Sequence, residues 1–427
     1  PARPVEPDQP APSGPTGPFG SASADGVIRR PGTGSGDRDE VRAARIALSW
    51  LCEPGHRALG QTVRVLGPVA ALRRIIAGRA PESVRTAVAA RLGAADPWRM
   101  ADRLADEGRR LGCRLLTPED EEWPRQLDDL VRIGVAADGR RFAHTDPPLC
   151  LWVRGEPTLN TALDRAVAVV GSRASTSYGN HVAGEFAYGL AGEGWTVVSG
   201  GAYGIDAAAH RGALGAGEVT VAVLACGVDV VYPVGHASLF ERIGDQGLLI
   251  SEWPPGTTPH RHRFLIRNRV IAALCRGTVV VEASARSGAR NTARRTRQLG
   301  RSLMAVPGPV TSGMSVGPHV LMREEDARLV TSVAEILEEV GRIGEDLAPV
   351  PRGPVTPRDD LDDMSIRVLD AVPLGRPGTV EEIAVEAGVH PVQVRRTLPM
   401  LALLGFVLET PTGYRIADER QRPPPTR

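Results

Sequence analysis

The sequence contains no lysine, because all 51 of its basic side chains are arginine. A Walker-type phosphate loop and Schiff-base catalysis both depend on a lysine, so both are excluded. Aromatic residues make up only 4% of the chain, which limits the number of rings that could stack on bases. The chain also lacks an uncharged apolar run of roughly 18 residues, the length that indicates a membrane span. We therefore expect no membrane partner.

Cysteine is scarce and scattered, with five residues and no Cys-x-x-Cys pair. This pattern excludes a disulfide framework and a cysteine zinc site, and it favours a reducing compartment. Histidine and acidic residues do not recur at the spacing of metal ligands. The N-terminal residues show no secretory signal pattern. We expect a cytoplasmic protein without a bound metal or cofactor.

The net charge is only +1, but the charge is unevenly distributed. Residues 260–301, here called the basic band, contain eleven arginines and a single acidic residue, Glu282. The rest of the chain has 40 arginines and 49 acidic residues, a net charge of −9. A basic band on an otherwise acidic protein is typical of a polyanion partner, although a solvated helix face would give the same composition.

The length of 427 residues predicts two or three domains. Low apolar content predicts disorder at the N-terminal end, and a proline-rich stretch predicts a linker. Amphipathic segments ended by Gly or Pro predict a small helical domain of the SAM-like or helix-hairpin-helix-like type. Three further helices and a hairpin predict a winged helix. The expected boundaries are disorder 1–38, helical domain 39–116, Rossmann-like domain 117–342, linker 343–358, winged helix 359–420 and tail 421–427.

The region 117–342 alternates short β-branched runs with helical patterns. The runs are apolar at every position, which indicates strands covered on both faces. Strands that alternate with helices predict right-handed crossovers and a doubly wound, mostly parallel α/β sheet. The predicted strands are 166–171, 195–201, 219–227, 248–252, 278–284 and 302–308.

Ligands of such a sheet bind beyond the carboxyl ends of its strands. The first strand is followed by a loop of small residues with Gly171, Ser172 and Arg173, which opens a helix. Small residues bring backbone N–H groups close to an anion, the helix N-terminus favours negative charge, and Arg173 adds a guanidinium fork. The alternative is a tight strand-to-helix turn. The loop does not match the dinucleotide-binding Gly-x-Gly-x-x-Gly pattern.

The second strand ends in Ser199 and is followed by three glycines that permit close backbone approach, Gly200, Gly201 and Gly204. Asp206 and His210 lie four residues apart on the following helix. They would form either part of a phosphate site or an acid–base pair. We favour a structural role, in which Asp206 caps the helix and shapes the loop while His210 packs beside it.

The third feature is the helix within residues 260–274. Arg263, Phe264, Arg267 and Asn268 lie within one turn of each other, and we expect the arginines on the helix surface. Guanidinium groups for phosphates, an amide for a base or sugar, and a ring for stacking suit single-stranded nucleic acid. A further loop, residues 282–293, leads from a strand into another arginine-bearing helix.

In order along the chain, the motifs GSRxxxxYG, SGGAxGIDxxAH, the YP after VLACGVD, ISEWPPG, RFxxRNRxIA, VVEAxxxSG and AVPG resemble the DNA-processing protein A family (DprA, also called Smf). The resemblance covers residues 149–340. It implies an extended Rossmann-like fold that binds single-stranded DNA, forms a homodimer and loads the RecA recombinase during natural transformation. It implies no enzymatic role.

The resemblance also implies the DNA contacts, residue by residue. Leu265 replaces the proline usual after Phe264, and Pro318 and His319 depart from the family pattern near the end of the domain. The implied DNA-binding residues are Gly171, Ser172, Arg173, Ser199, Gly200, Gly201, Arg263, Phe264, Arg267, Asn268, Arg269, Ser287, Gly288 and Arg290, with Gly204, Asp206 and His210 assigned to loop geometry and capping.

Two other functions are compatible with parts of the sequence. A nucleoside-monophosphate phosphoribohydrolase shares a related fold, but such enzymes carry a PGGxGT loop where this chain has SGGAYG. A transcriptional regulator would use the winged helix on duplex DNA, yet its recognition helix offers only Arg395 and Arg396 for reading base edges.

Overall fold

The computed structural model describes residues 35–133, 144–342 and 357–417. These residues form two compact units that divide between residues 348 and 349. Most of the predicted N-terminal disorder lies outside the described residues, as do residues 343–356 of the predicted linker and the predicted tail 421–427. Within the described ranges, no helix is long and apolar enough to cross a membrane.

The first unit begins with five helices, as predicted: α1 (Ser35–Leu51), α2 (Arg57–Leu66), α3 (Pro68–Ile76), α4 (Glu82–Leu92) and α5 (Pro97–Arg110). Helix α1 starts before the predicted boundary at residue 39, so residues 35–38 are helical. Asp96 caps α5 by accepting a hydrogen bond from the Arg99 N–H at 2.8 Å, and Pro97 occupies the first turn. Buried side chains such as Leu48, Leu72 and Val84 form the core of this helical region.

A nine-stranded sheet follows, in the order β1-β2-β6-β5-β4-β3-β7-β8-β9. All six predicted strands belong to it, and β3 to β9 pair in parallel. The sequence analysis missed the short strands β1, β2 and β9, and β1 and β2 pair antiparallel at one edge. The strands are β1 (Arg114–Leu116), β2 (Leu151–Arg154), β3 (Ala166–Val170), β4 (Thr196–Ser199), β5 (Thr220–Leu224), β6 (Leu248–Ser251), β7 (Gly277–Val280), β8 (Ser302–Ala305) and β9 (Arg328–Leu329).

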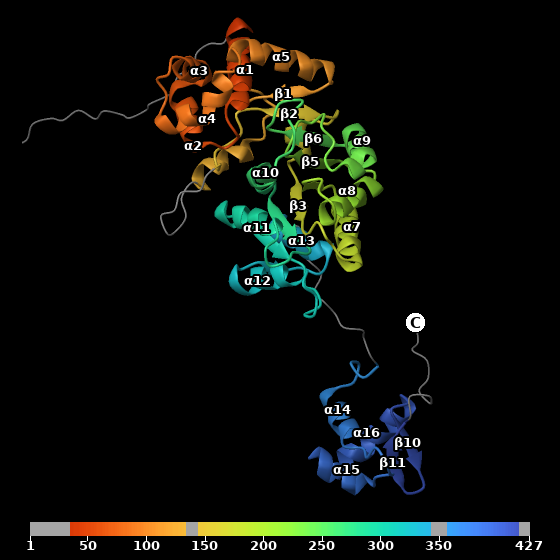
Figure 1. Ribbon diagram of the computed structural model, residues 1–427. Coiled ribbons are helices and arrows are strands. Elements are labelled where there is room, and N and C mark those ends of the chain that lie inside the picture. Colours follow the sequence, from red (N-terminus) through yellow and green to blue (C-terminus); the bar gives the residue numbers. More distant parts are fainter. Residues whose placement is uncertain (1–34, 134–143, 343–356, 418–427) are drawn as a thin grey trace, which may run out of the picture. The chain divides into compact units, whose positions relative to one another are not determined.

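Helices cover both faces of the sheet (Figure 1). On β3, Val167 and Val169 pack against α7, α8 and α13, whereas Ala168 and Val170 pack against the layer of α10, α11 and α12. This alternation explains the uninterrupted apolar runs. The remaining elements are 3₁₀ helices η1 (Arg125–Ile133) and η2 (Val234–His236), and helices α6 (Leu159–Ala162), α7 (Ser177–Gly192), α8 (Ile205–Gly215), α9 (Ala237–Gln246), α10 (Arg261–Leu274), α11 (Ala289–Gln298), α12 (Val316–Glu324) and α13 (Val333–Val340).

The strand order reverses at β3. From β3 the chain proceeds through β4, β5 and β6 on one side, and then returns to place β7 on the other side of β3. Such a reversal leaves a crevice at the carboxyl ends of the central strands, where open α/β sheets bind their ligands. The loops that follow β3, β4 and β7 therefore meet at one edge.

The second unit contains three helices and an antiparallel hairpin, in the order that the sequence predicts. Thr379 and Glu382 form a reciprocal capping box at the start of α15, and Gly388 ends that helix with a φ of 61°. Val368, Ile383, Leu398 and Val407 contribute to its own apolar core. The elements are α14 (Asp363–Asp370), α15 (Val380–Ala387), α16 (Pro391–Leu403), β10 (Val407–Thr410) and β11 (Gly413–Ile416).

Candidate nucleic-acid interface

Residues from two loops and one helix meet at the carboxyl edge of β3 and β4. We call this group the carboxyl-edge cluster: Gly171, Arg173, Gly200, Gly204, Phe264 and Arg267. The first two follow β3, the glycines at 200 and 204 follow β4, and the last two lie on α10. The cluster thus combines backbone, guanidinium groups and one ring.

Glu282, two residues beyond the end of β7, holds the loop that follows β3. Its carboxylate accepts hydrogen bonds from the Thr176 N–H at 2.8 Å and the Thr176 hydroxyl at 2.6 Å. Its backbone carbonyl accepts from the Ser172 N–H at 2.7 Å. The sequence analysis counted Glu282 only as the one acid of the basic band. An acidic residue that follows a buried strand inside a basic segment is the signal that could have identified it.

Glycine is required where these loops approach each other. Gly204 has a φ of +77°, and a Cβ there would lie 2.3 Å from the Ser172 carbonyl oxygen. At Gly200, a Cβ would lie 2.0 Å from Nη1 of Arg267. Larger residues would separate the two loops or displace the guanidinium group, so the backbone is brought close to the arginine only by these glycines.

The serines of the two loops shape the backbone. Ser199 is fully buried, and its hydroxyl donates to the Val169 carbonyl at 2.7 Å. The Ser172 hydroxyl oxygen accepts from the Ala174 N–H at 3.2 Å. Gly201, with a φ of +70°, packs beside Phe240. These predicted contact residues therefore fix the loop conformation.

Arg267 lies under the glycine loop. The prediction that it sits on the helix surface is wrong, because only 3% of the residue is exposed. It donates one hydrogen bond to the Val223 carbonyl, and its Nε has no hydrogen-bond partner. Burial lowers the pKa of Arg267 to about 10, and the nearby Asp206 carboxylate opposes this shift, so the group stays charged at neutral pH. No carboxylate of the described residues lies within ion-pairing distance of it.

The outer part of the cluster consists of the exposed Arg173 and the half-buried Phe264. The Arg173 guanidinium carbon lies 4.6 Å from the centre of the Phe264 ring. The Phe264 ring also contacts Tyr232, at a ring-centre distance of 5.6 Å. Within the described part of the chain, no carboxylate pairs with Arg173. Arg173 is thus an accessible cation beside the buried Arg267.

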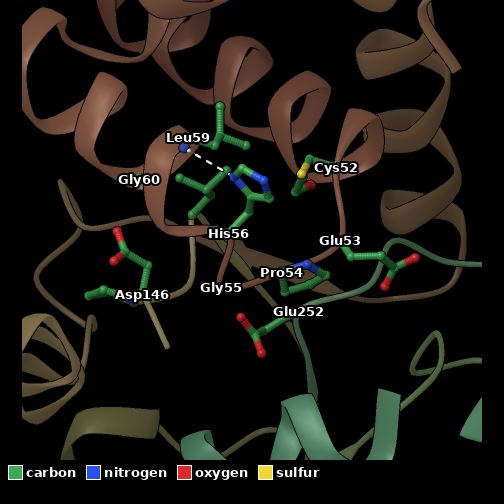
Figure 2. Close-up of a pocket in the computed structure, with 12 residues that line it drawn as sticks. Cys52, Glu53, Pro54, Gly55, His56, Leu59, Gly60, Asp146 and Glu252 are labelled. Carbon is green, nitrogen blue, oxygen red and sulfur yellow. Dashed lines mark hydrogen bonds between the residues drawn. The ribbon is translucent and has the colours of Figure 1, made fainter. Parts of the chain in front are cut away.

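Arg269 and Arg263 do not join the cluster, contrary to expectation. Arg269 is 1% exposed and forms a bidentate ion pair with Glu252, in which its Nη1 and Nη2 donate to Oε1 and Oε2 at 2.6 and 2.7 Å. Arg263 is also buried and pairs with Glu53, which follows α1, at 2.6 and 3.1 Å. Figure 2 shows the cavity between the helical region and the sheet, with Glu53 on the helical side and Glu252 on the sheet side. Arg263 therefore links α10 to the helical region, whereas Arg269 links α10 to the segment that follows β6.

The loop after β7 is tied to α10. The Asn268 side-chain amide donates to the Gly288 carbonyl at 3.3 Å, and the Ser287 hydroxyl oxygen accepts from the Ala289 N–H at 3.3 Å. Arg290 pairs with Glu325 at 3.2 Å and remains about one-third exposed. The Asn268 amide is therefore used within the protein, and Arg290 is held by Glu325 and the Ala285 carbonyl.

Asp206 and His210 do not form an acid–base pair. His210 is fully buried, its Nδ1 lies 2.8 Å from the Thr220 hydroxyl, and burial lowers its pKa to about 3, so it is neutral. Asp206 accepts from the Ala202 N–H at 3.4 Å, and burial raises its pKa although Arg267 opposes the shift. The predicted role of Asp206 in loop geometry fits this contact. The prediction that Asp206 caps the helix is wrong, because Gly204 is the N-cap residue of α8 and no side chain forms a capping hydrogen bond there.

Metal ligation finds no support at this edge or elsewhere in residues 35–133, 144–342 and 357–417. No group of three or more His, Cys, Asp or Glu side chains there could hold a metal ion.

Two exposed tyrosines beside the cluster, Tyr203 and Tyr232, were missed as site residues. Both stand within quoted motifs, but nothing in their spacing marked them as exposed.

The model of the family described as DNA recombination-mediator protein A matches residues 114–341, more than half of the chain. The chain belongs to this family. A Mycobacterium tuberculosis (strain H37Rv) relative described as a DNA processing protein DprA is 46% identical over 371 residues, which cover 86% of this chain and 92% of the relative. Protein Smf of Escherichia coli (strain K12) is 38% identical over 305 residues, covering 70% of this chain and 76% of that protein.

A solved structure supports the family fold. The crystal structure of DNA processing protein A from Streptococcus pneumoniae is similar with a TM-score of 0.57 and 30% identity. The similarity covers 71% of this chain and 98% of that one. The family assignment thus confirms the resemblance noted from the motifs, and the mixed α/β architecture with a large, mostly parallel sheet agrees with it.

Proposed function

We propose that this DNA-processing protein binds single-stranded DNA at the carboxyl-edge cluster. The observation that carries the proposal is Arg267, a buried guanidinium group without a carboxylate partner, placed directly below Gly200. A buried charge is costly unless it is paired. A phosphate group lying on the glycine loops would pair with it and would also reach the exposed Arg173.

The surroundings of these arginines favour a single strand over a duplex. Phe264 lies beside Arg173, so a bound phosphate would have an aromatic ring next to it. A single strand can turn its unpaired bases onto such a ring, whereas the bases of a duplex are already stacked. Contacts through phosphates and ring faces carry little sequence information, so we expect no strong sequence preference.

We further propose that the chain acts as a recombination mediator in natural transformation, as a homodimer that protects incoming DNA and loads the RecA recombinase. Family membership supports this assignment. It is a binding role, and no catalytic function is assigned to any residue of the cluster.

We propose that the second unit is a winged helix that does not read duplex DNA. Its described residues, 357–417, include nine acidic and six basic side chains. Arg395 on α16 pairs with Glu381 at 3.3 Å. An acidic surface with few available cations is a poor match for the phosphates of a duplex.

The test is a filter-binding comparison of the full chain with single-stranded and duplex oligonucleotides of equal length, across a salt series. We expect tighter binding of the single strand at every salt concentration, for strands of different base composition. Equal or tighter binding of the duplex at physiological salt would contradict the proposal.

A further inference from the structure

Two exposed tyrosines stand next to the carboxyl-edge cluster. Tyr203, which immediately precedes Gly204, is 50% exposed, and Tyr232, in the loop that follows β5, is 43% exposed. Tyr188 on α7 is exposed to a similar extent, so it is the position of Tyr203 and Tyr232 beside the cluster, and not exposure alone, that distinguishes them. Their exposure at the edge of a candidate DNA site calls for a ligand that covers them.

Both rings are held in place by neighbours. The Tyr203 ring packs edge-on against His236 at a centre distance of 4.6 Å. His236 is itself buried, with Nδ1 3.1 Å from the Gly201 carbonyl oxygen. Tyr232 packs against Phe264, whose other neighbour is Arg173. Tyr232 therefore contacts the cluster directly through Phe264, and Tyr203 is linked through His236 to Gly201, in the glycine loop of the cluster.

We propose that Tyr203 and Tyr232 stack on bases of the bound strand, on either side of a phosphate held by Arg173 and Arg267. This inference rests on the proposed function. Stacking on an aromatic face tolerates any base, because every base has a π-face. The placement divides the site into a phosphate-binding floor of glycines and arginines and a rim of rings that contacts bases.

The continuity of the contacts favours a nucleic acid over a protein partner at these rings. Val231 and Val234 are also exposed nearby, and an apolar patch alone would suit a protein. However, the cationic Arg173 lies on Phe264, which contacts Tyr232, so charge and ring surface alternate as the phosphates and bases of a strand do.

The experiment uses the full-length protein with Tyr203→Ala, Tyr232→Ala and the matching Tyr→Phe variants. Tyr188→Ala is the control, since Tyr188 is 54% exposed on α7 and belongs to no part of the cluster. Fluorescence anisotropy measures Kd for labelled oligothymidine and for an abasic oligonucleotide of the same length. Thermal melting verifies that each variant is folded.

We expect each Tyr→Ala change to weaken oligothymidine binding by about 5- to 100-fold, the range of one lost base stack. Tyr→Phe and Tyr188→Ala should retain the affinity, and abasic binding should be the same for all variants. Unchanged oligothymidine binding, or an equal loss on both ligands, would overturn the inference. So would Tyr→Ala variants that bind DNA normally but fail to bind purified recombinase, since the rings would then serve a protein partner. A parent protein that binds neither oligonucleotide would refute the proposed function itself.

Discussion

Helices α10 and α11 both belong to the basic band, yet three of the four arginines on α10 are buried, whereas on α11 only one of four, Arg295, is buried. On α10, Arg263, Arg267 and Arg269 are at most 4% exposed. On α11, the side chains of Arg290 and Arg297 are 34% and 43% exposed and share Glu325. The difference lies in what covers each helix, since Glu53 and Asp146 reach α10 from distant segments. Arginine content alone therefore does not locate a binding surface.

The largest effect should come from the buried ion pair on α10. Arg269→Ala removes both hydrogen bonds of the bidentate ion pair with Glu252 and the hydrogen bond to the Asp146 carbonyl. The buried Glu252 carboxylate is then left without its partner. We expect a loss of about 3–5 kcal/mol in the free energy of unfolding. Chemical denaturation monitored by circular dichroism measures it.

Arg297→Ala on α11 is the matched control. Its ion pair with Glu325 is 3.2 Å long and partly solvated, so its removal should cost about 0–1 kcal/mol. Equal destabilisation by the two changes would show that the contrast between the helices is wrong.

A smaller effect is expected where the helical region meets α10. Burial alone would raise the pKa of Glu53, but hydrogen bonds from Arg263 and Trp253 outweigh burial and hold the pKa below its usual 4.5. A depressed carboxylate pKa stabilises the fold above the unfolded-state value, and this stabilisation is lost as pH falls through the folded-state pKa. Glu53→Gln should therefore destabilise the protein by about 1–3 kcal/mol at pH 7. The difference from the parent should shrink as the pH falls below 4.5.

Denaturation of both proteins from pH 7 toward pH 3 provides the measurement. Glu107→Gln, on an exposed pair with Arg110, is the control and should change stability little at any pH. A difference between Glu53→Gln and the parent that stays constant with pH would contradict the role assigned to Glu53.

The sequence was sufficient to predict the central strands and the edge where the site lies. Uninterrupted β-branched runs marked β3 to β8, and parallel strands place their carboxyl ends at the same edge. Gly200 and Gly204 were correctly expected to permit close approach, because only glycine tolerates those contacts. Strands β1 and β9 were missed because three and two residues carry too little pattern, and β2 was missed although β4, β6, β7 and β8, which were predicted, have the same length of four residues.

The burial of α10 could not be predicted. Arg263 pairs with a glutamate 210 residues away, and Arg269 contacts a carbonyl 123 residues away. Local periodicity contains no information about such partners, so three charged residues on one helix suggested a solvated face. Tyr203 and Tyr232 escaped notice for the same reason, since exposure is decided by the packing of loops after different strands.

These observations leave Arg173 as the best probe of the proposed site, because it is exposed and mutation there leaves the core intact. Arg267 is unsuitable, since its removal would also disturb buried packing. Arg276 is a fitting control: its side chain is 39% exposed, and it lies before β7, at the opposite edge of the sheet. Both residues have one ring contact, with Phe264 and Trp195 respectively.

The decisive measurement is the slope of log Kd against log salt for single-stranded DNA, with the parent, Arg173→Gln and Arg276→Gln. If Arg173 neutralises a phosphate, its removal should flatten the slope by about 0.7, the value for one contact on a single strand. Arg276→Gln should leave the slope unchanged. If the two substitutions flatten the slope equally, binding depends on a diffuse positive field, and the carboxyl-edge cluster is not the DNA site.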